Sequence, residues 1–268
     1  MAKKATSTET NKQKKLRAPP FETASLREQI SKFYETPYTD ASGTQKAVGS
    51  YTWGVYLFYD YDGEPIYVGQ SYEKIGGRIG RHMTNQRTDA VAMSVLDPFE
   101  VCEIAIYPLP EFEGINKDHP RFKEARKHLN ALEYAVHQEA IGKSAFKAIL
   151  NEQIPKTPLD AVPIPTPIRG RIVSDDVLRL RAHPDVRIAR RAQTIAKLAQ
   201  VISERELRGD GLRRVIVVQS DRLAALANKR FVDLYGKTIA QDAKEGGLDG
   251  EDGDEDDAEV NDEVNGET

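Results

Sequence analysis

The sequence predicts an α/β chain of the α+β class. A small mixed or antiparallel three-stranded sheet flanked by helices is expected, then a mostly helical basic region and a disordered acidic tail. Two runs rich in β-branched and aromatic residues meet at Asp62-Gly63, a strong hairpin signal. Residues 120–141 repeat apolar side chains at helical spacing. Charge is segregated along the chain, so the formal net charge of −4 describes no single part of it.

The N-terminal part predicts an arm, a helix and a loop. Residues 1–20 carry six basic residues and one acidic residue and end in two prolines, which predicts a disordered basic arm. Residues 22–35 follow as a short helix, because their apolar side chains fall on one face. Turn-forming residues cluster over residues 37–43 and predict a loop.

The middle of the chain predicts the sheet and its helices. Residues 51–61 and 65–69 form the two strands of the predicted hairpin. A helix is expected over residues 73–85, and a third strand over residues 99–107, which two prolines end. The amphipathic pattern over residues 120–141 then predicts a long helix.

Five prolines within residues 155–167 predict a stiff linker between domains. We therefore expect a first domain over residues 21–155, a linker at 156–168 and a basic helical accessory domain over residues 169–240. Its expected elements are helices near 174–182, 184–207 and 221–235, and a strand at 213–218. Residues 241–268 have the composition of a disordered acidic tail.

The charge distribution indicates a polyanionic partner. Residues 242–268 hold 13 acidic residues and one lysine, a net charge of −12, so residues 1–241 carry −4 + 12 = +8. Residues 169–237 hold 16 basic and 8 acidic residues, a net charge of +8. Such basic segments suit nucleic acid. The alternative is that these lysines and arginines only solvate helix faces.

The cysteine count and the hydropathy of the chain indicate the cellular compartment. The single cysteine, Cys102, lies in an apolar run and is expected to be a buried thiol, and one cysteine allows no intrachain disulfide. No stretch approaches 18 apolar residues, and the basic N-terminus lacks the apolar core of a signal peptide. We therefore expect no membrane association and a reducing cytoplasm.

The predicted hairpin carries two related tripeptides, Gly54-Val55-Tyr56 and Tyr67-Val68-Gly69. Each glycine allows close backbone approach, and each tyrosine presents a phenol from the same sheet. Further polar residues follow in order along the chain: Arg78, His82 on the same helical face four residues later, Glu133 on the apolar stripe of the long helix, and Asn151 before the prolines. A carboxylate on an apolar stripe needs a partner or a metal ion.

These parts, in this order, resemble the GIY-YIG endonuclease family over about residues 50–155. Valines replace the two isoleucines of the family name. Gln70 stands where a lysine is frequent, and the arginine lies one residue further along than is usual. The stretch between Glu133 and Asn151 is also longer than the family tends to have, which leaves the role of Asn151 open and keeps Glu139 as a second candidate for the acid.

The resemblance implies a metal-dependent endonuclease that hydrolyses DNA phosphodiester bonds. It implies one divalent ion, Mg²⁺ or alternatively Mn²⁺, held by Glu133 as metal ligand. Tyr56 would help deprotonate the attacking water, and Arg78 would hold the scissile phosphate through two hydrogen bonds. Tyr67 would hydrogen-bond the phosphate or the water, and His82 would accept or relay the proton. Asn151 completes the set of candidate catalytic residues.

Two readings of this resemblance stay open. The first is an active nuclease whose basic C-terminal region contributes DNA binding. The second is a catalytically inactive nucleic-acid-binding module of the same fold. Loss of activity is expected to remove the first tyrosine, the arginine or the glutamate, and all three positions are filled here. A weaker third reading is a regulatory partner that uses its acidic tail to mimic DNA. The alternatives for the tail are contact with the chain's own basic surface or with another protein, or a role in solubility. A homo-oligomer is also open, because one active site cuts two strands only in two visits or with two subunits.

Overall fold

The computed structural model describes residues 20–83, 95–204 and 209–245 of the chain. The chain divides into two compact units, residues 1–227 and 228–268. The first unit contains a four-stranded antiparallel sheet in the order β4-β3-β5-β6. Its strands are β3 (Trp53–Tyr59), β4 (Pro65–Tyr72), β5 (Glu103–Pro108) and β6 (Ile168–Arg171). The predicted α+β class is confirmed, and the sheet has one strand more than expected.

The predicted hairpin of β3 and β4 turns at Gly63, whose φ of 74° lies in the left-handed region that favours glycine. In its register, Tyr56 lies opposite Gly69 and Phe58 lies opposite Tyr67. Because directly opposite residues share a face of the sheet, the two motif tyrosines lie on the same side of it.

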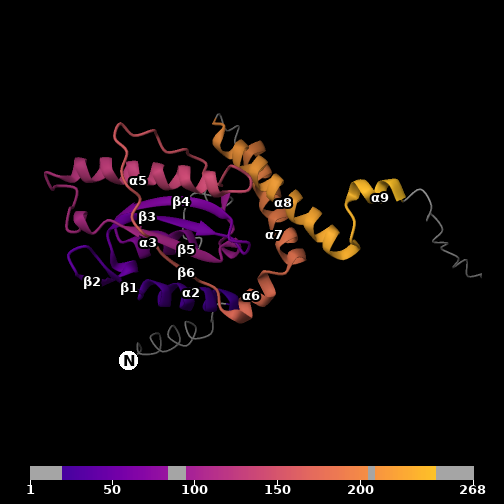
Figure 1. Ribbon diagram of the computed structural model, residues 1–268, viewed down its shortest axis with the longest axis horizontal. Helices are drawn as coiled ribbons and strands as arrows, with labels where there is room; N and C mark the ends of the chain where they lie inside the picture. The colour runs from indigo at the N-terminus through magenta and orange to yellow at the C-terminus, as the bar shows by residue number, and fades with distance from the viewer. Residues whose placement is uncertain (1–19, 84–94, 205–208, 246–268) are drawn as a thin grey trace, which may run out of the picture. The chain divides into compact units, whose positions relative to one another are not determined.

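Helices cover both faces of the sheet (Figure 1). The helix α5 (Phe122–Lys143) packs on one face, where Val55 and Leu57 of β3 join its apolar stripe. The helices α2 (Phe21–Tyr34) and α3 (Ile75–Met83) pack on the other face, against Tyr56 and Phe58. All seven residues of β3 are buried as a result. The central strand of the motif is therefore held from both sides.

Residues 37–47, where a loop was expected to begin, form a small hairpin of β1 (Pro37–Thr39) and β2 (Gln45–Ala47). Among the described residues, short 3₁₀ helices connect some of the larger elements: η1 (Val48–Ser50), η2 (Pro98–Glu100) and η3 (Pro110–Phe112). The predicted third strand therefore begins at Glu103 and not at Phe99, because Asp97 accepts a hydrogen bond from the Phe99 amide and caps a helical turn there.

The C-terminal helices α6 (Asp175–Arg181), α7 (Pro184–Glu204) and α8 (Gly211–Tyr235) begin in the first unit. Their buried apolar residues join the same core as α2 and α3: Leu198, Ile202, Leu212, Val215 and Val218. The strand predicted at residues 213–218 is wrong, because this segment lies within α8. Val215 and Val218 are buried at helical spacing while Val217 is exposed, so packing overrides the preference of valine for strands.

A cluster of buried ion pairs joins α7 and α8 to the hairpin turn. The carboxylate of Asp60, only 2% exposed, lies 3.3 Å from Arg187, 3.0 Å from Arg191 and 2.6 Å from Arg222. These three arginines are each at most 3% exposed, and Arg191 also pairs with buried Glu100 at 2.9 Å. Several arginines of the basic segment are thus structural, and they cannot contact a polyanion at the surface.

The buried thiol predicted at Cys102 is confirmed. The side chain of His137 is also buried, at 2% exposed, because it lies on the packed face of α5.

The second unit contains the end of α8 and α9 (Ile239–Glu245). Among the described helices, none has both the length and the apolar composition needed to cross a lipid bilayer.

Candidate active site

The two glycines of the hairpin make room for the residues around them. A Cβ atom at Gly69 would overlap the ring and hydroxyl of Tyr56, so the phenol lies directly over the backbone of β4. A Cβ atom at Gly54 would overlap the Tyr107 carbonyl oxygen on β5 and the end of the Ile75 side chain on α3. The tripeptides thus fix how closely the tyrosine, the sheet and α3 approach one another.

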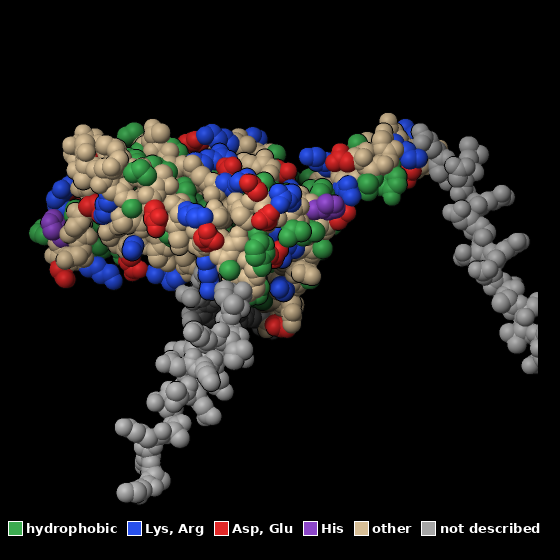
Figure 2. Space-filling view, turned by 90° about the horizontal axis from the view of Figure 1, so that it is seen from below, with side chains coloured by type: hydrophobic (Ala, Val, Ile, Leu, Met, Phe, Trp, Pro, Cys, Tyr) green, Lys and Arg blue, Asp and Glu red, His purple; other side chains and the backbone are tan. Residues whose placement is uncertain are grey.

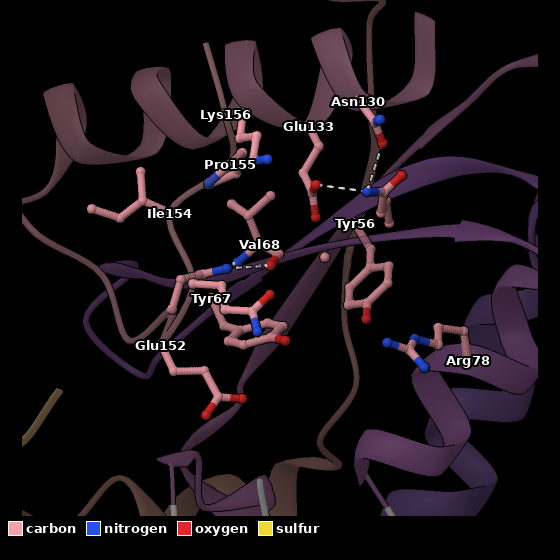
Figure 3. Close-up of a pocket in the computed structure, with 14 residues that line it drawn as sticks. Tyr56, Tyr67, Val68, Arg78, Asn130, Glu133, Glu152, Ile154, Pro155 and Lys156 are labelled. Carbon is pink, nitrogen blue, oxygen red and sulfur yellow. Dashed lines mark hydrogen bonds between the residues drawn. The ribbon is translucent and has the colours of Figure 1, made fainter. Parts of the chain in front are cut away.

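A cavity of about 450 Å³ opens beside β4, which is an edge strand of the sheet. Five of the six predicted site residues line it: Tyr56, Tyr67, Arg78, Glu133 and Asn151, of which the first four are labelled in Figure 3. They come from β3, β4, α3, α5 and the segment after α5. The fold therefore brings together residues that lie up to 95 positions apart in the sequence.

Tyr56 is fully buried, and its hydroxyl points toward the guanidinium of Arg78 in Figure 3. Burial raises the pKa of Tyr56 far above its ordinary value, and nearby Tyr67 raises it further. Arg78 acts in the opposite direction, because its positive charge favours the phenolate. Arg78 itself has no carboxylate within salt-bridge distance among the residues that the structure describes, so it is available to an anionic ligand.

Glu133 points into the cavity from α5 and is partly buried. Its Oε2 accepts a hydrogen bond of 2.8 Å from the Gln70 side chain, which also donates to Asn130 at 3.0 Å. Burial raises the pKa of Glu133 to about 7, while the Gln70 hydrogen bond, Arg126 and Arg78 act to lower it. A carboxylate that burial disfavours so strongly is stabilised in its charged form by a further cation.

His82, the sixth predicted residue, does not line the cavity. It is 9% exposed and packs beneath both motif tyrosines, with ring centroids 5.8 Å from Tyr56 and 5.3 Å from Tyr67. The structure therefore places the His82 ring against both phenol rings and outside the lining of the cavity.

Asn151 uses both atoms of its amide on the backbone of β4. Its Nδ2 donates to the Val68 carbonyl at 2.7 Å, and its Oδ1 accepts from the Val68 amide at 2.9 Å. The neighbouring Leu150 amide donates to Ile66 at 2.8 Å. This segment thus runs along the free edge of β4 and holds the cavity wall in place.

Glu139, the second candidate for the acid, lies elsewhere. It is half-buried on α5, forms an ion pair with Lys143 one turn later, and does not line the cavity.

The sequence analysis missed further polar residues of the site, among them Gln70 and Asn130, which line the cavity, and Arg126, which donates to Gln70. Arg126, Asn130 and Glu133 are spaced by four and three positions, so they share one face of α5. This spacing was readable from the sequence once Glu133 had been singled out.

The residues present fit a hard divalent cation. Among the described parts of the chain, no three His, Cys, Asp or Glu side chains converge on one point. The cavity offers the Glu133 carboxylate together with the Asn130 amide, and the Glu152 carboxylate also lines it, whereas the Asn151 amide is engaged on the Val68 backbone. Oxygen donors with few protein ligands suit a hard divalent ion that keeps several of its waters or takes phosphate oxygens.

The fold is of the α+β class, and tyrosines, an arginine and a glutamate surround one cavity. The family model described as the GIY-YIG catalytic domain matches residues 52–112, which confirms the resemblance expected from the sequence. The match includes Tyr56, Tyr67 and Arg78 and ends before Glu133. No curated protein and no solved structure matches the chain.

Proposed function

We propose that the protein is a metal-dependent endonuclease that hydrolyses phosphodiester bonds in DNA. The observation that carries this proposal is the convergence of Tyr56, Arg78 and Glu133 on a single cavity. Phosphodiester hydrolysis needs an activated water, countercharge for the transition state and relief for the leaving oxygen. These three side chains supply the groups that such a reaction uses.

Each residue has a separate role in the proposed reaction. Arg78 binds the scissile phosphate, since its guanidinium matches two phosphate oxygens. Tyr56 orients the attacking water, and as the phenolate, which the positive charge of Arg78 favours, it takes the proton that this water releases. Tyr67 donates a hydrogen bond to the phosphate. A divalent ion, Mg²⁺ or Mn²⁺, held at Glu133 would supply Lewis-acid stabilisation of the charge that develops on the phosphate.

Two predicted residues take supporting roles in this proposal. His82 packs against both tyrosine rings and fixes their positions. Asn151 holds the edge of β4 through Val68 and places Tyr67 and Gly69 around the cavity.

The proposed contribution of residues 169–240 to DNA binding rests on the cations that stay exposed there. Lys197 and Arg213 are exposed, whereas Arg187, Arg191 and Arg222 are buried in the ion-pair cluster. On the face seen in Figure 2, lysine and arginine side chains are interspersed with acidic ones. We therefore propose a scattered set of phosphate contacts, which positions a duplex and reads no sequence.

The test is incubation of the full-length protein with supercoiled plasmid and magnesium, with and without a chelator. Relaxed or linear plasmid is expected with magnesium, and none with chelator present. Glu133→Gln is expected to abolish cutting. The matched control is Glu139→Gln, an equivalent change on the same helix but outside the cavity. This variant is expected to cut as the wild type does. Equal cutting by both variants would reveal a contaminating nuclease or a different metal site. DNA binding without cutting by the wild type would favour the inactive binding module.

A further inference from the structure

A second cavity, of about 260 Å³, adjoins the candidate active site. Three arginines line it: Arg78 and Arg81 from α3 and Arg126 from α5. It shares Arg78 and Gln70 with the first cavity, so the two spaces lie side by side along the end of β4.

The three arginines leave this cavity positive. Glu73 is the single acid among its lining residues, and it pairs with Arg81 at 3.2 Å. Both side chains of that pair are well exposed, at 43% and 59%, and an ion pair of this kind in water is weak. Arg81 can therefore exchange Glu73 for a stronger anion, such as a phosphate, without loss of a buried contact.

Arg126 is held in place for a ligand by neutral groups. Its guanidinium lies 4.2 Å from the centre of the Tyr72 ring, and its Nη1 lies 3.4 Å from Oε1 of Gln70. Stacking on an aromatic ring orients a guanidinium while leaving its donors free for hydrogen bonds. No described carboxylate lies within salt-bridge distance of Arg126, so its charge is not neutralised by a pair.

Gln70 separates the two cavities chemically. Its amide nitrogen donates to Glu133 on one side, and its carbonyl oxygen faces Arg126 on the other. Gln70 thus lies between Glu133 and Arg126. Glu133 lines the first cavity, and Arg126 lines the second.

We propose that the second cavity binds a phosphate next to the scissile phosphate on the same DNA strand. This inference rests on the proposed function, because it takes the ligand of the first cavity to be DNA. Guanidinium groups bind phosphate through paired hydrogen bonds, and three of them around one space form a strong site. Since Arg78 lines both cavities, consecutive phosphates of one strand occupy them. The contact fixes where the strand lies relative to Glu133 and Tyr56.

The test measures DNA binding in chelator, where no cutting occurs, with a labelled duplex oligonucleotide at a series of salt concentrations. Arg126→Gln is compared with the wild type and with Lys127→Gln. Lys127 is the adjacent residue on α5, is exposed and lies outside both cavities, so the control loses the same charge. The slope of log affinity against log salt is expected to shrink by about 0.9 for Arg126→Gln, the loss of one phosphate contact, and to stay unchanged for Lys127→Gln.

Arg81→Gln serves as a second variant, because its exposed side chain leaves folding intact. It is expected to reduce the slope in the same way. A wild-type slope for both arginine variants would overturn the second phosphate site and leave the proposed nuclease function standing. Absence of duplex binding by the wild type would overturn the proposed function, and the inference with it.

Discussion

Replacement of Asp60 by alanine tests the buried ion-pair cluster. The Asp60 carboxylate is the shared partner of Arg187, Arg191 and Arg222, at 2.6–3.3 Å, and all four side chains are nearly inaccessible to water. Asp60→Ala removes one negative charge and leaves three buried guanidinium groups with Glu100 as their remaining buried acid. Water cannot reach these groups to replace the lost partner.

Removal of one member of a buried ion pair costs about 3–5 kcal/mol, because the remaining charge stays desolvated. This loss is large beside the total stability of a folded domain, roughly 5–15 kcal/mol. Asp62 offers a matched control in the same turn. Its side chain is 49% exposed and lies 2.6 Å from Arg187, which keeps Asp60 as a partner, so Asp62→Ala is expected to cost less than Asp60→Ala.

Urea unfolding followed by tryptophan fluorescence measures both changes. Trp53 is the single tryptophan of the chain and is fully buried in β3, so its emission reports on the sheet. With a denaturant slope of about 2–3 kcal/mol per molar, Asp60→Ala is expected to lower the midpoint by roughly 1–2 M. A loss below about 1 kcal/mol, or the same loss for both variants, would refute a cluster that depends on Asp60.

Four further predictions concern the site, the buried phenols and the tail. Glu133→Ala is expected to abolish magnesium-dependent cutting while DNA binding in chelator, followed by fluorescence anisotropy, stays nearly unchanged; a parallel loss of binding would assign the residue a structural role. Tyr56→Phe is expected to lower the single-turnover rate by about 100-fold or more, and a near-normal rate would make it a packing residue. Burial raises the pKa of Tyr61 and Tyr107, so the unfolded chain releases these protons at a lower pH than the folded chain does. The urea midpoint is therefore expected to fall as the pH rises above about 10, the ordinary pKa of tyrosine. A midpoint that does not fall in this range would contradict the prediction. Truncation after Gln241 is expected to tighten non-specific DNA binding most at low salt, whereas equal affinities at every salt concentration would point to another role for the acidic tail.

The sequence predicted the parts of the fold that local signals determine. The β3–β4 hairpin and α5 carry a strong turn and a long amphipathic repeat, and both formed where expected. The strand β6 was missed because Ile168–Arg171 is short and pairs with β5, more than sixty positions earlier in the chain. The strand wrongly predicted at residues 213–218 also reflects a long-range effect. Its residues prefer strands locally, but packing against the core makes the segment helical.

The candidate site was predicted through the resemblance, since its residues lie far apart in the sequence. Their convergence on one cavity depends on α3 and α5 packing on opposite faces of the sheet and meeting at the edge of β4. Charge counts were less informative for the C-terminal region. A count does not distinguish an exposed arginine from one such as Arg222, whose partner Asp60 lies 162 positions away.

Asn151 has a consequence for how this protein meets other chains. An unpaired strand at the margin of a sheet is a template on which a foreign polypeptide can add, and that route leads to aggregation. The side-chain amide of Asn151 consumes both backbone groups of Val68, and the Leu150 amide takes the Ile66 carbonyl. This stretch of β4 is therefore closed to intermolecular strand addition. A peptide cannot add as a strand to this part of the β4 edge, beside the cavity. A ligand that does not bind as a β-strand can still enter the cavity.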